Sequence, residues 1–333
     1  MRLEFTPSPE RRASLRAQRA RLEQPTDVLT VLRSALATDV AAGGVACTVE
    51  SVHPDRFVLR ARVCTRLGEW RAYALKAYAD DFGERVWAHA RALAACGQMA
   101  PDGLCLPIRY VAQEHLLVFP WVEGRCLTDI GDDGALFRRA ACLTASLHRL
   151  PLVPEPPTTP EQLIAHVSAR CEWLRRRRPE AAPVMEPLVP ALTDAVTALD
   201  PAQPTAVHGD LWAGQFLWTG ERLVLLDLDA FGYTDPAYDV GHFLAQLERG
   251  GLVDPARAAR VDRLQATFLD AYRSSMPAVS ARNVAFYRAL TLARKIHTVC
   301  RTDPAGWPRL AVALARRARA ALEEMATAAV SVS

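Results

Sequence analysis

Apolar and polar residues alternate along the first part of the chain with the period of two that β-strands require. Residues 56–66 (RFVLRARVCTR) and 69–79 (EWRAYALKAYA) both show this alternation. The short break between them, at Leu67–Gly68, predicts an antiparallel hairpin. Residues 115–124 (HLLVFPWVEG) predict a further, buried strand that ends at Pro120. We therefore expect a small sheet in this part of the chain.

Helical periodicity surrounds these strands and dominates the rest of the chain. Ser8 followed by Pro9 predicts the start of one helix, and a second helix is expected after Asp27. A third follows the hairpin and should end near Gly97. Further helices are predicted over 135–150, most of 161–199, 238–248, 255–275 and 280–326, with two short strands around 216–218 and 222–228.

This order of elements predicts an α+β chain with two lobes. A chain of 333 residues is long enough for two separate cores, because single cores stop growing near ~250–300 residues. The expected divisions are an N-terminal helical extension over 1–44, a strand-rich N-lobe over 45–120, a connector over 121–124 and a helical C-lobe over 125–333.

Composition narrows the classes of protein that fit. No apolar run approaches the ~20 residues of a membrane helix, so no membrane partner is expected. The N-terminal segment has arginines but lacks the apolar stretch of a secretory signal. The eight cysteines occur singly, which favours reduced thiols and a cytoplasmic location. The basic first helix has no interleaved aromatic residues, so no nucleic-acid partner is expected. The oligomeric state stays open.

Lysine and asparagine are almost absent. Of the 40 basic residues only Lys76 and Lys295 are lysines, and Asn283 is the single asparagine. Such arginine- and alanine-rich usage is typical of a GC-rich bacterial genome. Because the chain has arginine at nearly every basic position, each of its two lysines is a candidate for a specific role. For Lys76, in the centre of the strand YALKAY, this favours a functional role over that of an exposed strand lysine.

Groups suited to phosphoryl transfer occur in a suggestive order. The reaction needs a cation on the nucleotide phosphates, oxygen ligands for Mg²⁺ and a carboxylate facing the attacking hydroxyl. Lys76 is the candidate cation. Asp210, in His208-Gly209-Asp210-Leu211, is the candidate carboxylate. The amide of Gln215 lies five residues later, and Asp227 ends an apolar strand further on.

Two segments carry a family resemblance. HGDLWAGQFLW (208–218) and LVLLDLDAFGYTDPAYDVGHFL (223–244) resemble the aminoglycoside phosphotransferase–choline kinase family, whose members are small-molecule relatives of the protein kinases. The connector LLVFPWVEG and a helix ending in SLHRLP follow the family order as well. The resemblance implies a bilobal protein-kinase-like fold with a small antiparallel-sheet N-lobe and a large helical C-lobe.

The resemblance also implies an activity and a set of partners. The protein would transfer the γ-phosphoryl group of ATP or GTP to a hydroxyl of a small molecule, such as an aminoglycoside, an amino alcohol or a sugar. Mg²⁺, with Mn²⁺ as an alternative, would be the cofactor. A peptide Ser/Thr kinase of a natural-product pathway is the alternative enzyme.

Roles follow residue by residue on the matching positions of the second lobe. Asp210 would hold and deprotonate the acceptor hydroxyl, and Gln215 and Asp227 would bind the metal. His208 would pack beneath the loop and support it. Asp239 would be a structural anchor that reaches back to the catalytic loop.

The nucleotide would be bound mainly by the first lobe. Lys76 would contact the phosphates, and the backbone around Trp121 and Val122 would meet the adenine. Glu84 is the only carboxylate inside the following helix and is therefore a candidate partner of Lys76. His89 flanks the other side of that helix, and periodicity does not choose between the two.

Three departures from the family pattern keep alternatives open. Gln215 stands where the family has a metal-binding Asn, no glycine-rich loop precedes Lys76, and the acid that pairs with Lys76 is not defined by the sequence. A catalytically impaired pseudokinase that binds a nucleotide or a partner is therefore a second hypothesis. Asp229 and Trp212 are candidates for contacts with the acceptor or with a second metal ion, and Trp212 could equally fill the loop.

Other features are ambiguous by themselves. Asp227-Leu228-Asp229 imitates the nucleophile motif of haloacid-dehalogenase phosphatases, but Phe231 occupies the position where Thr or Val is expected. Arg175–Arg178 fits a solvated helix face better than a site for an anionic acceptor. His242 fits a packed helix residue better than a ligand.

Overall fold

The chain folds into two compact units. The computed structural model describes residues 7–36, 40–131, 133–152, 156–303 and 305–328. The sheet unit comprises the chain up to Gly124 together with Val224–Asp229, and the helical unit comprises residues 125–223 and 230–333. The boundary after Gly124 coincides with the expected end of the connector, but the return of Val224–Asp229 to the sheet unit was not expected.

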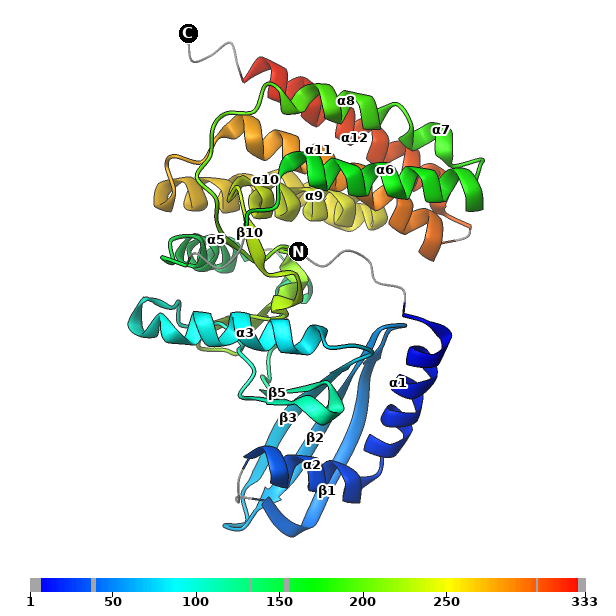
Figure 1. The fold of residues 1–333 in the computed structure, drawn as a ribbon. Coiled ribbons are helices and arrows are strands. Elements are labelled where there is room, and N and C mark those ends of the chain that lie inside the picture. Colours follow the sequence, from blue (N-terminus) through cyan, green and yellow to red (C-terminus); the bar gives the residue numbers. More distant parts are fainter. Residues whose placement is uncertain (1–6, 37–39, 132, 153–155, 304, 329–333) are drawn as a thin grey trace. The chain divides into compact units, whose positions relative to one another are not determined.

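The sheet unit is built on five antiparallel strands in the order β1-β2-β3-β5-β4 (Figure 1). The strands are β1 Val40–Val52, β2 Arg56–Thr65, β3 Trp70–Tyr78, β4 Arg109–Val111 and β5 Leu116–Pro120. β2 and β3 form the predicted hairpin. Lys76 lies in β3 opposite Val58 of β2 and Leu117 of β5, so its backbone is held on both sides.

Helices cover both faces of this sheet. α1 (Pro9–Leu22) and α2 (Pro25–Leu36) pack on one face against a cluster that includes Leu75 and Ala77. α3 (Phe82–Ala95) packs on the other through Val86. The first two helices thus lie in the same compact unit as the sheet. Because strand side chains alternate, Lys76 points to the face opposite Leu75 and Ala77.

Most of the helical unit follows the predicted helices. Its members are α4 Leu127–Ile130, α5 Gly134–His148, α6 Pro160–Arg177, α7 Ala182–Met185, α8 Leu188–Val196, α9 Ala237–Val253, α10 Pro255–Ser275, α11 Ala281–Thr302 and α12 Trp307–Thr327. Thr159 caps α6 with a capping box. The helical region expected over 280–326 contains two helices, and a proline in the first turn of α12 marks the start of the second.

Short strands frame the loop that carries the motif residues. β7 (Thr205–Val207) pairs antiparallel with β10 (Gly232–Thr234), and β6 (Arg125–Cys126) pairs with β8 (Phe216–Trp218). β9 is Leu223–Leu225, shorter than the strand expected over 222–228. The remaining single turns are 3₁₀-helical: η1 Gly97–Met99, η2 Ala112–Glu114, η3 Ala213–Gln215 and η4 Leu228–Ala230.

Two further expectations concern the whole chain. All eight cysteines are free thiols, in agreement with the absence of a disulfide framework from the sequence. Within the described ranges, none of the helices combines the length and the apolar character that a membrane span needs.

Candidate active site

The loop His208–Leu211 owes its shape to a glycine. Gly209 has a φ of +81°, a backbone conformation that favours glycine. A Cβ atom at this position would lie 2.0 Å from the carbonyl oxygen of Ala230. No other residue fits without moving the backbone, so the glycine of the motif sets the turn that presents Asp210.

A buried carboxylate fixes this loop. Asp239, in the first turn of α9, is fully buried and accepts hydrogen bonds from the backbone N–H groups of His208 (2.6 Å) and Gly209 (2.9 Å). Its Oδ2 also lies 3.0 Å from Nε2 of His148, whose Nδ1 meets the hydroxyl of Tyr272 at 2.7 Å. Burial alone would raise the pKa of Asp239, but the bond and charge of His148 and the backbone donors lower it. Asp239 is therefore a carboxylate at neutral pH.

Another histidine, His242, lies beside Asp210. Nε2 of His242, a fully buried residue of α9, lies 3.1 Å from Oδ1 of Asp210, whose side chain is 47% exposed. Burial pushes the pKa of Asp210 upward, yet the hydrogen bond from His242 and the charge of Lys295 hold it below its usual value. Asp210 is thus ionised and partly open to solvent, as a group that accepts a proton from an incoming hydroxyl must be.

His242 itself stays neutral. Burial lowers its pKa, and this outweighs the opposing effect of Asp210. Its Nδ1 faces the hydroxyl of Thr291 on α11 at 3.4 Å. A neutral imidazole that accepts from Thr291 donates its Nε2–H to Asp210, so His242 orients the carboxylate.

Gln215 closes the same loop at the end of η3. Its side chain is partly buried and makes no hydrogen bond to any described residue, so its amide oxygen is free for a ligand. The indole of Trp212 lies over Gly214, because a Cβ on Gly214 would come within 2.2 Å of that ring. Trp212 therefore packs within the loop, and it also lines a pocket considered below.

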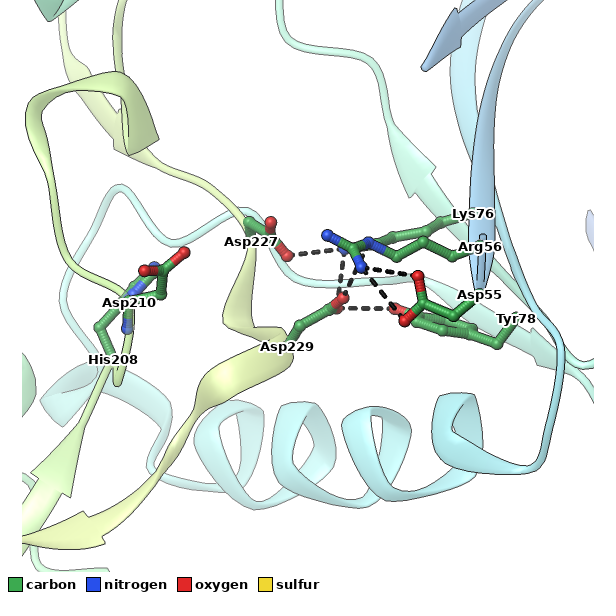
Figure 2. A network of polar contacts seen from close by, with 8 residues as sticks. All are labelled: Asp55, Arg56, Lys76, Tyr78, His208, Asp210, Asp227 and Asp229. Atoms are coloured by element: carbon green, nitrogen blue, oxygen red, sulfur yellow. Dashed lines mark hydrogen bonds and ion pairs between the residues drawn. The ribbon is translucent and has the colours of Figure 1, made fainter. Parts of the chain in front are cut away.

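The sheet unit contains the second group of motif residues (Figure 2). The ammonium of Lys76 lies 2.6 Å from Oδ1 of Asp227 and 2.7 Å from Oδ1 of Asp229. Tyr78 donates its hydroxyl to Asp229 at 2.7 Å. Arg56 lies 3.8 Å from Oδ2 of Asp229 and 3.1 Å from Asp55, so one lysine and one arginine face three carboxylates.

Burial and charge act against each other in this network. Burial alone would lower the pKa of Lys76, but Asp227 and Asp229 outweigh it and raise the pKa. Burial raises the pKa of Asp229, although Lys76 opposes this. Lys76 is therefore a charged, buried ammonium whose position depends on the two carboxylates.

The two aspartates reach Lys76 through a turn and not through strand alternation. The sequence predicted that Asp227 ends an apolar strand, but β9 ends at Leu225. Asp227 has a φ of +61°, and η4 follows at once. Such a backbone costs energy for a residue other than glycine and is concentrated at functional sites.

The oxygens at this turn suit a hard divalent cation. The Asp227 side chain is 32% exposed, and Oδ2 of Asp229 is buried without a hydrogen-bond partner among the described residues. Mg²⁺ prefers carboxylate and amide oxygens and keeps several waters or phosphate oxygens as further ligands. Within the described ranges no group of three or more His, Cys, Asp or Glu side chains forms a metal cage.

The expected partner of Lys76 is not the observed one. Glu84 is exposed in the first turn of α3, and His89 is buried in the same helix. Lys76 instead pairs with the two aspartates of the Val224–Asp229 segment. Periodicity alone does not distinguish a carboxylate that pairs with Lys76 from a surface acid, and Glu84 is a surface acid of α3.

The two residues of the connector expected near the base differ in their backbone hydrogen bonds. The N–H of Trp121 donates to the carbonyl oxygen of Ala72 at 3.0 Å, and the guanidinium of Arg60 lies 4.5 Å from the centre of the indole. Trp121 thus continues the sheet pairing of β5 with β3. Among the described residues the N–H of Val122 has no such partner, so Val122 is the residue of the two that could donate to a base.

A comparison with protein-family profiles identifies the family of this chain. The profile described as the phosphotransferase enzyme family matches residues 66–282, which include Lys76, Asp210 and Asp239. The chain belongs to the phosphotransferase enzyme family. It is therefore a phosphotransferase of the kinase type that acts on hydroxyl groups, and the suspected relationship is confirmed. No curated protein sequence matches the chain.

Solved structures establish the fold of this phosphotransferase. A choline/ethanolamine kinase family protein from Mesorhizobium loti is 16% identical, with a TM-score of 0.59 over 94% of this chain and 97% of that one. A spectinomycin phosphotransferase solved with ADP and spectinomycin is 10% identical, with a TM-score of 0.58 over 92% and 98%. An amicoumacin kinase solved with AMP-PNP and Ca²⁺ is 15% identical, with a TM-score of 0.61 over 92% and 96%. At these identities the likeness confirms the predicted protein-kinase-like α+β fold alone.

Several supporting residues of the phosphotransferase were missed from the sequence. His148 was noted only within the motif SLHRLP, and His242 only as a packed residue. Tyr78 and Arg56 lie on strands whose alternation gave no hint of a polar network. The available signal was position: Tyr78 lies two residues after Lys76, so both side chains leave β3 on the same face.

We expect Lys76→Arg to weaken nucleotide binding by about tenfold or to reduce turnover strongly. The ammonium is compact and lies between two carboxylates, whereas a guanidinium is a wide, planar fork that this buried position does not accommodate. Nucleotide affinity can be measured by calorimetry, and Arg62→Lys, an exposed position on β2, is the control. If Lys76→Arg binds and turns over like wild type, Lys76 has no special role.

We expect Asp239→Asn to lower the free energy of unfolding by about 3 kcal/mol at pH 7, because it removes a buried charge bonded to His148 and two backbone donors. The folded pKa of Asp239 lies below the ordinary 3.8, so its contribution is present above that value and is lost as pH falls through it. The difference between wild type and variant should therefore shrink below about pH 4. Urea unfolding at several pH values measures it, with exposed Asp194→Asn as control; a difference that does not change with pH would contradict this account.

Proposed function

We propose that this protein transfers the γ-phosphoryl group of a purine nucleoside triphosphate, with Mg²⁺, to a hydroxyl of a small molecule. The observation that carries the proposal is the ionised, partly exposed Asp210 on a loop fixed by Asp239, in a chain whose other unit holds Lys76 against Asp227 and Asp229. Each unit thus supplies one half of the chemistry that phosphoryl transfer needs.

Asp210 is suited to hold the acceptor hydroxyl. Its lowered pKa keeps it a carboxylate across the physiological range, and His242 fixes one of its oxygens. A weak base suffices here, because in a loose transition state the attacking oxygen gives up its proton late. Asp210 would accept a hydrogen bond from the hydroxyl first and its proton afterwards.

The reaction balances with these groups. The acceptor oxygen forms a bond to the γ-phosphorus, the bond between that phosphorus and the β–γ bridging oxygen breaks, and the nucleoside diphosphate leaves. The hydroxyl proton passes to Asp210 and then to solvent. Lys76 would contact the phosphates and offset the negative charge that collects on the leaving group.

The metal would be held by Asp227 and by the amide oxygen of Gln215, with Asp229 available for a second ion. When bound, Mg²⁺ neutralises phosphate charge and orients the γ-phosphoryl group. Gln215 is one methylene longer than the Asn of the family pattern, but both offer an amide oxygen. Because Asp227 and the phosphates carry the charge, a shifted amide or a bridging water can complete the metal's ligands.

Nucleotide selection would depend on the connector. The N–H of Val122 would donate to the base, while the indole of Trp121 is held by the cation–π contact with Arg60. A small-molecule acceptor fits better than a peptide, since the family and the structural neighbours include choline and antibiotic kinases.

A second candidate function is favoured by Gln215 alone. A phosphotransferase fold that binds a nucleotide without turnover would tolerate a longer amide at the metal position. The charged, ordered network around Lys76 would serve such a binding module equally well. Asp210, ionised and oriented by His242, is the observation that a binding module does not explain.

We expect Asp210→Asn to leave nucleotide affinity nearly unchanged and to reduce turnover by roughly 10²–10⁴, as loss of a general base does. Release of nucleoside diphosphate with a panel of hydroxyl compounds gives turnover, and nucleotide-induced thermal shift gives binding. Turnover within threefold of wild type would remove Asp210 from the reaction. A nucleotide-induced shift in wild type without turnover on any compound would favour the binding module.

We expect Gln215→Asn to retain metal-dependent turnover and Gln215→Ala to lose most of it, because only the alanine removes the amide oxygen. Titrations with Mg²⁺ and Mn²⁺ measure the metal dependence, and Mn²⁺ shares the preference for oxygen ligands. Equal behaviour of all three proteins would mean that Gln215 does not touch the metal. Turnover in the asparagine variant alone would establish that the natural protein is impaired.

A further inference from the structure

One face of α9 leads away from Asp210. His242, Gln246 and Arg249 follow one another at the spacing of successive helical turns, so they lie on the same side of the helix. His242 contacts Asp210 at 3.1 Å, and the amide of Gln246 lies 3.3 Å from His242. The acid next to Arg249 in sequence, Glu248, is engaged elsewhere: it lies 3.4 Å from Arg288. This face therefore carries Arg249 without an acidic neighbour of its own.

α11 brings the second lysine of the chain to the same place. Thr291 contacts His242, and Lys295 lies four residues later, one turn along the same face. Arg294 donates to the hydroxyl of Tyr238, which precedes His242 by one turn of α9. Lys295 lies beyond residue 282, where the match to the family profile ends, so it is a feature of this chain and not of the matched motif.

Arginines outnumber carboxylates among the main electrostatic neighbours of Lys295. Its main electrostatic neighbours are one carboxylate, Asp210, and three arginines: Arg294, Arg249 and Arg170 of α6. Burial and these arginines lower the pKa of Lys295 to about 8, so it is still charged at neutral pH. Nε of Arg249 is buried without a hydrogen-bond partner, and neither Arg249 nor Lys295 has an ion pair within the described part of the chain.

A pocket adjoins this cluster. Its volume is about 280 Å³, close to the lower end of the range for ligand sites. Trp212 of the catalytic loop and Gln246 and Arg249 of α9 line it, and Phe137 and Leu264 give it an apolar wall. A compound in this pocket would lie between the segment that follows Asp210 and an unpaired arginine.

The arginine run considered from the sequence does not take part. Arg175 and Arg176 are 54% and 73% exposed and pair with Glu172, and Arg175 also pairs with Glu186. This run is a solvated helix face. The two cations of the cluster that have no ion pair within the described part of the chain, Arg249 and Lys295, come from α9 and α11.

We propose that the acceptor carries an anionic group, a carboxylate or a phosphate monoester, that Lys295 and Arg249 bind while its hydroxyl faces Asp210. The proposal rests on the proposed function in taking Asp210 as the group that meets the acceptor. Charge-assisted hydrogen bonds from lysine and arginine are the usual means of holding such anions. A cationic acceptor, such as a quaternary ammonium compound, would be repelled by the same cluster.

Matched sets of hydroxyl compounds test this directly. Each set, built on an aromatic, an amino-acid or a sugar scaffold, presents one hydroxyl compound as a carboxylate, a phosphate monoester, a neutral carboxamide and an ammonium derivative. Binding is measured by calorimetry with a non-hydrolysable nucleotide present, and transfer by release of nucleoside diphosphate. In at least one set we expect an anionic member to bind roughly 10- to 100-fold more tightly than its carboxamide, as charge-assisted bonds allow. The carboxylate and phosphate arms show which anion is preferred.

Variants assign the preference to the cluster. Lys295→Gln and Arg249→Gln should each reduce the ratio of anion to carboxamide affinity by about tenfold and leave carboxamide binding unchanged. Arg176→Gln, on the solvated face, is the matched control and should change neither. Thermal unfolding verifies that each variant is folded, and Lys295→Arg, which keeps the charge, should retain the preference.

A pH series gives an independent measure. Lys295 loses its charge as pH rises through about 8, whereas the arginines around it stay charged and Asp210 stays ionised. The affinity for the anionic member should therefore fall above pH 8 in wild type. It should remain nearly constant in Lys295→Arg, and the carboxamide should show no such change in either protein.

The outcomes separate this proposal from the proposed function. An anion preference that is lost in the two variants, without transfer to any compound, keeps the anion site and overturns the proposed function. Transfer that favours the carboxamide or the ammonium member, or an anion preference that persists in both glutamine variants, overturns the anion site and leaves the proposed function intact. Equal binding of all members in every set also overturns the anion site.

Discussion

The carboxylate of Asp239 is the interaction on which the candidate active site depends. It is fully buried, yet it accepts two backbone N–H groups of the motif loop and a bond from His148. A buried charge is stable only when it is compensated in this way, and the bonds that compensate it hold the loop in one conformation. The orientation of Asp210 follows from that conformation, and His242, one turn further along the same helix, completes it. α9 thus positions the reactive loop with one face and carries the unpaired Arg249 on the next turns.

A comparable principle operates in the sheet unit with the signs reversed. There the central charge is the ammonium of Lys76, and Asp227 and Asp229 compensate it. The turn that brings both carboxylates to it has a positive φ at Asp227, a conformation that the surrounding contacts must hold in place. A nucleotide with its metal would enter a network that is already charged and ordered.

The sequence predicted the strands, most helices and the order of the motif residues, because these depend on local periodicity and short spacings. It failed where a contact joins distant segments. The partner of Lys76 was sought in the next helix, whereas Asp227 and Asp229 lie 151 and 153 residues further along the chain. The strand was expected up to residue 228 because apolar residues continue past Leu225, but β9 ends at Leu225. The roles of His148 and His242 could not be assigned from the sequence, because a histidine on an apolar helix face gives the same pattern whether or not a carboxylate lies opposite it.

The segment Val224–Asp229 has a consequence for how this protein can be divided. By its contacts it belongs to the sheet unit, but it is encoded a hundred residues after that unit's last continuous stretch ends at Gly124. A fragment that stops at Gly124 would contain Lys76 without either carboxylate that compensates it, and a buried, uncompensated ammonium is costly. The sheet unit is therefore not an independent module of the gene. Recombination or truncation at the connector would separate Lys76 from its counter-ions, so we expect the two units to be inherited together.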